Sequence, residues 1–540
     1  MKYISIFGYY GFENTGDDAV LRSLLDDLCQ SEETLYIVVF SDDPQKTEAL
    51  YADAGIHACR WDDHACLNMA VSQSDLLLIG GGGLYNCYLD YPAELLLKGN
   101  HRYFSVVTFG LPFLARIWGT PCAVIGCGAS EVLSEEAREH IGVSLTLLSE
   151  ITVRDEGTKA ILSAFRRKGG EVSELSEIPK IRVTADPVFR LDDSNAVFCE
   201  AEQAYLDSVC AEKGKERFVI GVSLRNWLSD NESALQAVAE AIQMVAGEHK
   251  CLVLFLAFDN GQSVDHLSSD STVALRLQEL LAPDPAVQFS YWPAYLRPYF
   301  ASRLISQCDV MIAMRLHPVV MSIKNRIPVI GLMYDQKVRS IMRECGLEEY
   351  CLDLGTVTGE QIIRLLKRSV CEKRVKEAGA VMRERAQDNI RMVHRLLESV
   401  PRWESAETDI IGHQLRQYFR SDIRAQFERE KADTLASGDY ESVRRMCRLI
   451  HPERWDAQLS YELAFSLHQL GETEEALRYY AAALHGGFSE YWVRYNRSQL
   501  YDEMGETELA TQDIRRAYEI DPTSDCKCVL AKITGRRRKR

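Results

Sequence analysis

The stretch Asp75-Leu76-Leu77-Leu78-Ile79-Gly80-Gly81-Gly82-Gly83 decides the fold class of this 540-residue chain. Its apolar run shows no alternation, which is typical of a strand buried on both faces of a parallel sheet. The glycines that follow place bare backbone at the carboxyl edge of that sheet, where α/β proteins bind ligands. We therefore expect Gly81, Gly82 and Gly83 to lie beside a ligand. A tight turn that needs positive φ is the alternative.

Similar apolar runs alternate with helical patterns on both sides of this stretch. The first series of predicted strands covers residues 2–7, 34–40, 75–79, 121–126, 150–153 and 181–184. A second series covers 218–224, 251–256, 309–313 and 327–332. Such alternation predicts parallel sheets covered by helices. We expect an α/β fold of two Rossmann-like domains, at 1–190 and 215–400, the second closed by a long charged helix at 372–400.

The last quarter of the chain repeats with a period of 34 residues. The segment from Gly471 to Ala476 recurs from Gly505 to Ala510, and Ala483 recurs as Ala517. Glycine at the turn and alanine at a tight helix crossing resemble a tetratricopeptide repeat. We expect an all-α repeat domain at 407–530, which binds a protein partner or mediates self-association. A basic tail follows at 531–540, either a solvated end or a contact with anionic lipid.

Composition limits the classes of partner. Lys plus Arg number 62 and Asp plus Glu 79, a net charge of −17 that argues against nucleic-acid binding. Sixteen cysteines without a Cys-x-x-Cys pair favour reduced thiols, and no metal-ligand spacing stands out.

Prolines interrupt the most apolar segment, 104–126, so we expect a buried helix and strand there, with shallow membrane contact as the alternative. With no leader pattern at residues 1–8, the predicted location is the cytoplasm, with the inner face of the membrane left open.

A glycine-rich loop at residues 8–19 follows the first predicted strand and opens a helix at about 17–28. Glycines there permit close backbone approach, and a helix N-terminus favours an anion. Asn14 and Asp17 are candidate substrate contacts in this loop. The alternative for Asp17 is that it caps the helix.

Basic side chains follow predicted strands at the ligand edge of both sheets. Arg315 and His317 lie in the expected loop between the strand ending near residue 313 and a helix starting at Pro318, where they offer a fixed cation beside a proton donor. Lys337 follows the next strand, and either binds a phosphate or is solvated. Arg154 and Arg225 end strands of the two domains, and each either contacts substrate or forms an interdomain ion pair.

These motifs in this order are similar to those of the polysaccharide pyruvyl transferases. They are the loop at 8–18, the glycines at 80–83, and the segments 153–155, 184–187, 222–225, 315–317 and 334–337. The resemblance covers about residues 1–360 and implies a fold like the GT-B glycosyltransferases, with the site between two domains. It implies phosphoenolpyruvate as donor, a hexose in a glycan or glycan-lipid precursor as acceptor, a pyruvate ketal as product, and no cofactor.

The expected chemistry assigns His317 as the general acid that protonates the methylene carbon of the donor. Arg315 would hold a carboxylate or phosphate by a bidentate fork, and Arg154, Arg225 and Lys337 would offset the remaining charge. No metal or nucleotide is needed. Two other functions stay open: a GT-B glycosyltransferase that uses a nucleotide sugar, and a non-catalytic scaffold in which the repeats do the work.

Overall fold

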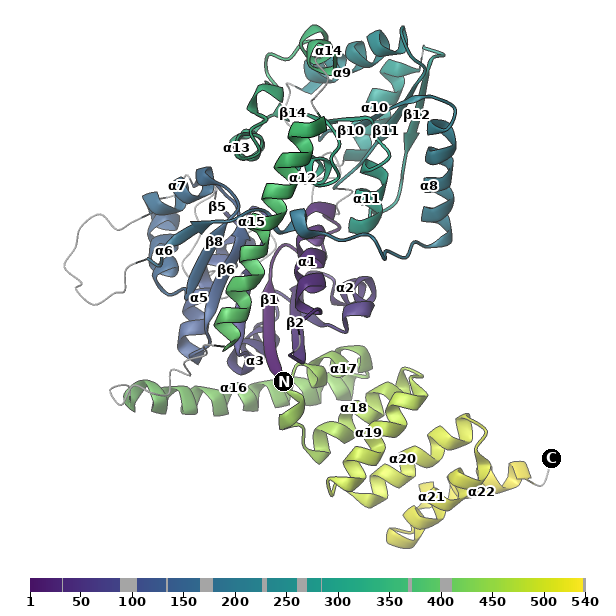
Figure 1. Cartoon of the computed structure of the whole chain (residues 1–540). Coiled ribbons are helices and arrows are strands. Elements are labelled where there is room, and N and C mark those ends of the chain that lie inside the picture. The colour runs from purple at the N-terminus through teal and green to yellow at the C-terminus, as the bar shows by residue number, and fades with distance from the viewer. Residues whose placement is uncertain are drawn as a thin grey trace. The chain divides into compact units, whose positions relative to one another are not determined.

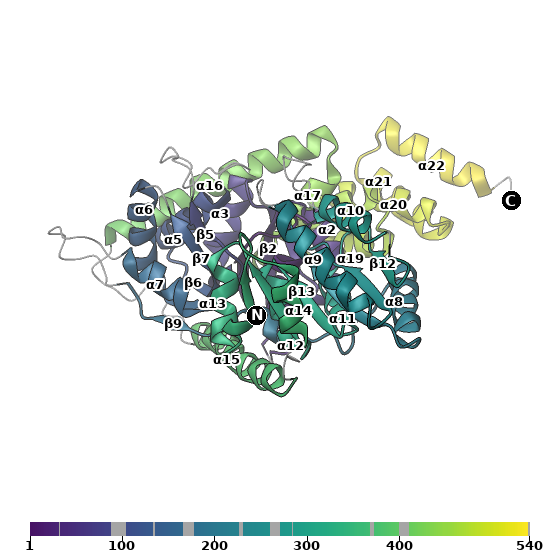
Figure 2. The same ribbon diagram turned by 90° about the horizontal axis from the view of Figure 1, so that it is seen from above.

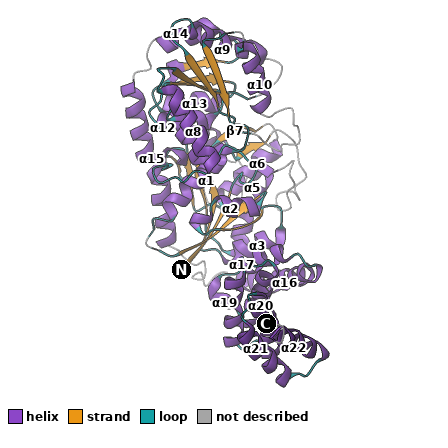
Figure 3. Cartoon of the chain, turned by 90° about the vertical axis from the view of Figure 1, so that its right-hand side faces the viewer, coloured by secondary structure: helices purple, strands orange, loops and turns teal. Residues whose placement is uncertain are grey.

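The computed structural model describes residues 1–540 except 32, 88–103, 133–134, 166–177, 226–230, 260–269, 283, 368–371, 399–409 and 538–540. The chain forms two compact units. One comprises residues 1–64 and 74–408, and the other comprises 65–73 and 409–540. The first unit holds two parallel sheets with helices around each, and the second is helical (Figures 1 and 3).

The first sheet has seven parallel strands in the order β3-β2-β1-β4-β6-β8-β9. Their bounds are β1 Lys2–Phe7, β2 Leu35–Ser41, β3 His57–Arg60, β4 Leu76–Gly80, β6 Cys122–Cys127, β8 Glu150–Val153 and β9 Ile181–Val183. The decisive apolar run forms β4, all five residues of which are buried between β1 and β6. Six of the seven strands were predicted from the sequence, and β3 was not.

Helices of the first domain cover this sheet and lead into its ligand edge. They are α1 Thr15–Leu28, α2 Pro44–Leu50, α5 Phe104–Trp118, α6 Glu135–Thr146 and α7 Glu156–Ala164, with a short 3-10 turn η1 at Ala52–Ala54. A small two-stranded sheet pairs β5 Tyr85–Cys87 with β7 Ala129–Val132. No described helix is long and apolar enough to cross a membrane, and the predicted buried helix at 104–117 is α5.

The second sheet has six parallel strands in the order β12-β11-β10-β13-β14-β15. Their bounds are β10 Phe218–Ser223, β11 Cys251–Phe255, β12 Val287–Tyr291, β13 Val310–Ala313, β14 Val329–Met333 and β15 Cys351–Asp353. Its helices are α8 Glu200–Lys213, α9 Asn231–Ala246, α10 Asp270–Leu281, α11 Pro298–Ile305, α12 Leu316–Lys324, α13 Gln336–Glu344 and α14 Gly359–Lys367, and 3-10 turns lie at η3 Pro187–Arg190 and η5 Glu348–Tyr350. Figure 2 shows helices on both sides of this sheet. The two halves together give the fold class expected from the sequence, two Rossmann-like domains of GT-B type.

The long helix α15 (Glu372–Glu398) follows the second sheet but is anchored on the first domain (Figure 1). Its buried Asn389 accepts hydrogen bonds from the hydroxyls of Thr152 (2.8 Å) and Thr184 (2.7 Å) and donates to the Ala185 carbonyl (2.9 Å). The helix thus ties the last segment of the second domain back to β8 and β9.

Helix α1 makes further polar links between the two domains of this unit. The Thr15 hydroxyl donates to the Leu296 carbonyl at 2.7 Å, and the Tyr295 hydroxyl donates to Asp18 at 2.6 Å. Because these bonds hold the N-terminal turn of α1 against the second domain, they fix the distance between side chains that the two sheets contribute to a shared site.

The helical unit consists of antiparallel helices with glycines at the turns. They are α3 His64–Gln73, α16 Ile410–Ser437, α17 Tyr440–Arg448, α18 Ala457–Gln469, α19 Thr473–His485, α20 Glu490–Glu503, α21 Thr507–Ile520 and α22 Ser524–Arg537, with a 3-10 turn η7 at Pro452–Arg454. The turn residues Gly438, Gly471 and Gly505 have φ of +81°, +78° and +82°, and the repeated Ala483 and Ala517 are fully buried. The predicted basic tail is helical as far as residue 537, and the rest lies outside the described residues.

Helix α3 belongs to this unit although it lies early in the sequence. The Gln73 side chain donates to the Leu449 carbonyl at 3.3 Å and accepts from the backbone N–H of His451 at 3.0 Å. The repeat unit therefore includes one helix that the sequence placed in the first domain.

Candidate functional site

A cavity of about 330 Å³ lies at the carboxyl edges of both sheets. The first domain lines it with Tyr9, Asn14, Asp17, Gly83, Leu84, Asn86, Phe104 and Arg154, and the second with Arg225, Phe258, Arg315, Leu316, His317, Pro318, Tyr334 and Lys337. All the candidate charged residues predicted from the sequence therefore meet in one place. The volume is at the lower end of the range of about 300–1,000 Å³ for small-molecule sites.

The N-terminal turn of α1 forms one wall. Asn14 Oδ1 caps the helix by accepting from the N–H groups of Gly16 (3.0 Å) and Asp17 (3.3 Å). The alternative that Asp17 caps α1 is therefore wrong, and its carboxylate is left to line the cavity. Burial raises the pKa of Asp17 to about 7, and the neighbouring Asp18 adds to this rise, while Arg154 opposes it.

The glycines after β4 have different roles. Gly83 lines the cavity, with no atom near the position of an added Cβ. A Cβ on Gly81 would lie 2.0 Å from Val20, and one on Gly82 would lie 2.2 Å from Asp17 Oδ1. Gly81 (φ +28°) and Gly82 (φ +75°) therefore let α1 approach the strand closely. Neither is among the residues that line the cavity, and their contact with a ligand stays a prediction.

His317 lies in the first turn of α12 rather than in the preceding loop, because the helix begins at Leu316. Its ring packs against the N-terminal turn of α1, so closely that a Cβ on Gly16 would lie 2.0 Å from Nδ1. Nε2 is buried, has no hydrogen-bond partner among the described residues, and lies 3.7 Å from Asp186 Oδ2. Burial lowers the pKa of His317 to about 4, which the Asp186 carboxylate opposes and the Arg154 charge reinforces.

Arg315 lines the cavity, but its fork is occupied. Nε and Nη2 each donate to the buried Asp270 carboxylate at 2.7 Å, and Nη2 also donates to Asp259 at 3.1 Å. Burial alone would lower the pKa of Arg315, yet the two carboxylates raise it above its usual value. The prediction that Nε and Nη2 of Arg315 bind the donor as a bidentate pair is therefore wrong, because both atoms are bound to carboxylates. Arg315 instead links Asp270, at the start of α10, and Asp259 to the wall of the cavity.

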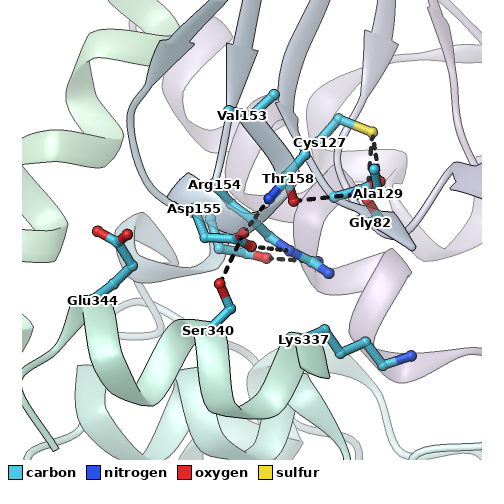
Figure 4. Close-up of polar contacts among 12 residues, drawn as sticks. Gly82, Cys127, Ala129, Val153, Arg154, Asp155, Thr158, Lys337, Ser340 and Glu344 are labelled. Atoms are coloured by element: carbon cyan, nitrogen blue, oxygen red, sulfur yellow. Dashed lines mark hydrogen bonds and ion pairs between the residues drawn. The ribbon is translucent and has the colours of Figure 1, made fainter. Parts of the chain in front are cut away.

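Arg154 extends from the end of β8 and is almost fully buried (Figure 4). Its guanidinium lies 3.4 Å from Asp186 and 3.6 Å from Asp155, both in the first domain. Its Nε has no hydrogen-bond partner among the described residues. Asp155 in turn accepts a hydrogen bond from Ser340 on α13, at 3.0 Å, which joins this strand end to the second domain.

Arg225 and Lys337 approach the cavity around Tyr334. The Arg225 guanidinium lies 5.4 Å from the centre of the Tyr334 ring, and Lys337 Nζ lies 5.1 Å from it. Burial would raise the pKa of Tyr334, but the charges of Lys337 and Arg225 outweigh it and lower this pKa. Figure 4 shows Lys337 extending in the same direction as Arg154, so cations from both domains face the same space.

Three residues at this site were not among the predicted ones. Asp186 lies between Arg154 and His317. Its segment, 184–187, was part of the family resemblance, but Asp186 itself was not predicted as a site residue. Tyr334, which contacts Lys337, likewise lies in a segment, 334–337, that was part of the resemblance. Asp270 contacts Arg315 from a position that carries no local signal in the sequence.

A second, wider groove of about 860 Å³ shares Tyr334 and Lys337 with the cavity. Its other walls include Arg138 of α6, residues of α7, and Arg339 and Arg343 of α13. The cavity thus opens beside a space large enough for a bulkier molecule.

Comparisons with known proteins identify the sequence family of the chain. Residues 14–336 match the sequence family described as polysaccharide pyruvyl transferase, and residues 493–524 match a tetratricopeptide repeat. Among solved structures, the chain is similar to the UDP-GlcNAc 2-epimerase from Methanocaldococcus jannaschii (TM-score 0.49, 11% identity, 73% of this chain and 100% of that chain). It is also similar to E. coli ADP-heptose LPS heptosyltransferase II (TM-score 0.36, 13% identity, 68% and 98%). The family match spans more than half of the sequence, and the chain belongs to the polysaccharide pyruvyl transferase family.

Proposed function

We propose that the chain transfers pyruvate from phosphoenolpyruvate to a hexose of a polysaccharide or glycan-lipid precursor and forms a pyruvate ketal. One observation carries the proposal. Arg154, Arg225 and Lys337 from both domains converge with His317 on a single small cavity. Three cations beside a proton carrier suit a small donor that carries both a carboxylate and a phosphate.

Charge supports an anionic ligand at this place. Arg154 is buried and faces two carboxylates at 3.4 Å and 3.6 Å, distances that are longer than those of a tight charge-assisted hydrogen bond, about 2.7–2.9 Å. A donor phosphate or carboxylate would supply the unmatched guanidinium edge with short bonds. Lys337 lies at the start of α13, so the positive end of that helix adds to the field.

The proposed reaction starts with transfer of a proton from His317 to the methylene carbon of the donor. An acceptor hydroxyl attacks the neighbouring carbon and loses its proton. The carbon–oxygen bond to phosphate then breaks, with the electron pair leaving on phosphate, and a second hydroxyl closes the ketal ring and loses its proton. Of the two hydroxyl protons, one leaves with phosphate and one returns to His317.

The low pKa of His317 fits this scheme once the charge of the donor is taken into account. Burial and the surrounding cations disfavour the imidazolium, and Asp186 alone favours it. A donor with two anionic groups would reverse that balance, because an opposite charge within about 4–6 Å favours the protonated ring. His317 would then take up a proton as the donor binds.

The decisive experiment compares wild type with His317→Ala. We expect release of phosphate from phosphoenolpyruvate, with a panel of p-nitrophenyl hexosides as acceptors, to fall by about 10²–10⁴-fold in the variant. Donor binding, followed by thermal shift, should persist because the cations remain. Unchanged turnover would remove His317 from the mechanism.

The same thermal-shift assay tests the choice of donor. A ligand at about 100 times its Kd stabilises a protein by roughly 2.7 kcal/mol. Phosphoenolpyruvate should produce such a shift and UDP- or ADP-sugars should not. The opposite result would make the chain a glycosyltransferase and contradict the proposal.

The helical unit suits a separate task. We propose that its repeats bind a protein partner or a second copy of the chain, because stacked helix pairs present an extended surface for such contacts. Light scattering over a concentration series distinguishes the two: a mass that grows with concentration indicates self-association.

A further inference from the structure

The proposed transfer needs two proton carriers, and His317 supplies only one of them. A proton must reach the methylene carbon while another leaves the attacking hydroxyl. In the proposed sequence His317 gives its proton to that carbon first and regains one from the second hydroxyl, so the proton of the attacking hydroxyl is left without an assigned acceptor. The site therefore calls for a second group that can accept a proton near neutral pH.

Among the described residues that line the cavity, Asp17 is the one carboxylate. Apart from His317, the remaining ionisable side chains there are arginines, a lysine and tyrosines, residue types whose ordinary pKa lies well above neutral pH. Asp17 comes from the first domain and His317 from the second, so the two reach the cavity from different walls.

The Asp17 carboxylate forms none of the hydrogen bonds or ion pairs that hold the described part of the fold together. No hydrogen bond or ion pair to it is found among the described residues, and only longer-range charges act on it. Its neighbour Asp18 differs, since the Tyr295 hydroxyl and the Gly11 N–H both bind its carboxylate. The helix cap is Asn14, so Asp17 has no structural task at the helix end either.

Close contacts hold Asp17 in place. Its Oδ1 lies where a Cβ on Gly82 would sit, so the strand end at residues 80–82 forms one side of its pocket. The residue before it, Gly16, lies against the His317 ring. Asp17 of α1 and the His317 ring of α12, which contacts Gly16, thus both lie at the first turn of α1.

We propose that Asp17 is the catalytic base of the transfer, accepting the proton of the hydroxyl that attacks the donor. This inference rests on the proposed function. The acceptor O–H bond breaks as its oxygen bonds to the donor carbon, and the proton passes to a carboxylate oxygen of Asp17. When the bond to phosphate breaks, the same proton leaves with phosphate, and Asp17 is restored. The raised pKa of Asp17, about 7, suits a base that works near neutral pH.

The test uses the full-length protein and the isosteric Asp17→Asn. We expect kcat to fall by about 10²–10⁴-fold, while affinity for phosphoenolpyruvate stays equal or increases, because a negative charge has been removed beside the donor. The matched control is Asp27→Asn, a carboxyl at the other end of α1 that pairs with Arg190 and does not line the cavity. Its kcat should stay within about threefold of wild type.

A second variant separates chemistry from folding. Asp17→Ala should lose activity and regain part of it in formate, since a small carboxylate can replace the missing base. A structural role would not be rescued in this way.

Failure of the inference can be told from failure of the proposed function. If wild type releases phosphate from phosphoenolpyruvate with some acceptor and Asp17→Asn does so within threefold, only the role of Asp17 is overturned. Loss of donor affinity by the same factor as kcat also overturns it, because Asp17 would then serve binding. If wild type releases no phosphate with any acceptor, both proposals fall.

Discussion

Gly16→Ala tests whether the His317 ring is held against α1. In the second residue of a helix, alanine is intrinsically better than glycine by about 1 kcal/mol, so propensity alone would make this change stabilising. The structure opposes this gain, because the new Cβ would lie 2.0 Å from Nδ1 of His317 and 2.6 Å from Cγ.

The size of the effect follows from that overlap. The contact must open from 2.0 Å to the 3.4 Å at which ordinary packing begins, so the ring must move by about 1.4 Å. A misplacement of about 1 Å can cost 10²-fold in rate. Overpacking costs about 1–3 kcal/mol, part of which the helix propensity offsets. We therefore expect kcat to fall by about 10²-fold or more, with a loss of at most about 2 kcal/mol in unfolding free energy.

The assay measures phosphate release and thermal unfolding on the same preparations. Gly214→Ala is the matched control: Gly214 ends α8 with φ −63°, and its added Cβ would meet only carbonyl oxygens at 3.5 Å. This control should be as active as wild type and equal or up to about 1 kcal/mol more stable. Full activity of Gly16→Ala at an unchanged melting temperature would refute the placement of the ring.

Two further predictions concern stability. Asp270→Asn should lower the free energy of unfolding by about 3–5 kcal/mol in chemical denaturation, because it removes the nearer and fully buried of the two carboxylates that pair with Arg315. A loss below about 1 kcal/mol would show that this pair is dispensable. Asp18→Asn should weaken the pH dependence of stability. The unfolded Asp18 ionises near its usual pKa of 3.8, whereas burial raises its pKa in the folded chain to about 7, so its contribution is fully present below about pH 4 and is lost as pH rises through 7. Denaturation of wild type at pH 5 and pH 8 should show a decline that is smaller in the variant, and an equal decline would contradict the assignment.

The interior strands could be predicted from the sequence, and most edge strands could not. Strands such as β4 and β10 are buried on both faces and therefore read as unbroken apolar runs. The missed strands of the two large sheets, β3, β12 and β15, all lie at sheet edges. β12 is only partly buried and alternates with polar residues, so its local pattern resembles that of a loop.

The cations of the site were predictable because each follows a strand, and the carboxyl ends of parallel strands converge. Their partners were not. Arg315 is bound by Asp270, 45 positions away, and whether its fork is free depends on where α10 begins. The cap of α1 was misplaced for a similar reason. Asn14 and Asp17 are both good capping residues, and only the backbone at Asn14 (φ −94°, ψ 101°) identifies the cap.

The pKa values of Asp17 and His317 bear on how the two groups share the proposed reaction. Burial raises the pKa of Asp17 to about 7 and lowers that of His317 to about 4, so near neutral pH the carboxyl is partly protonated and the imidazole is neutral. In the proposed reaction the imidazole must be charged and the carboxylate must be free of its proton. An anionic donor favours the charged imidazole directly. It also raises the pKa of Asp17, and the imidazolium formed beside that carboxyl opposes this rise. The proposed reaction therefore requires His317 to gain a proton and Asp17 to end without one once the donor's charge is added.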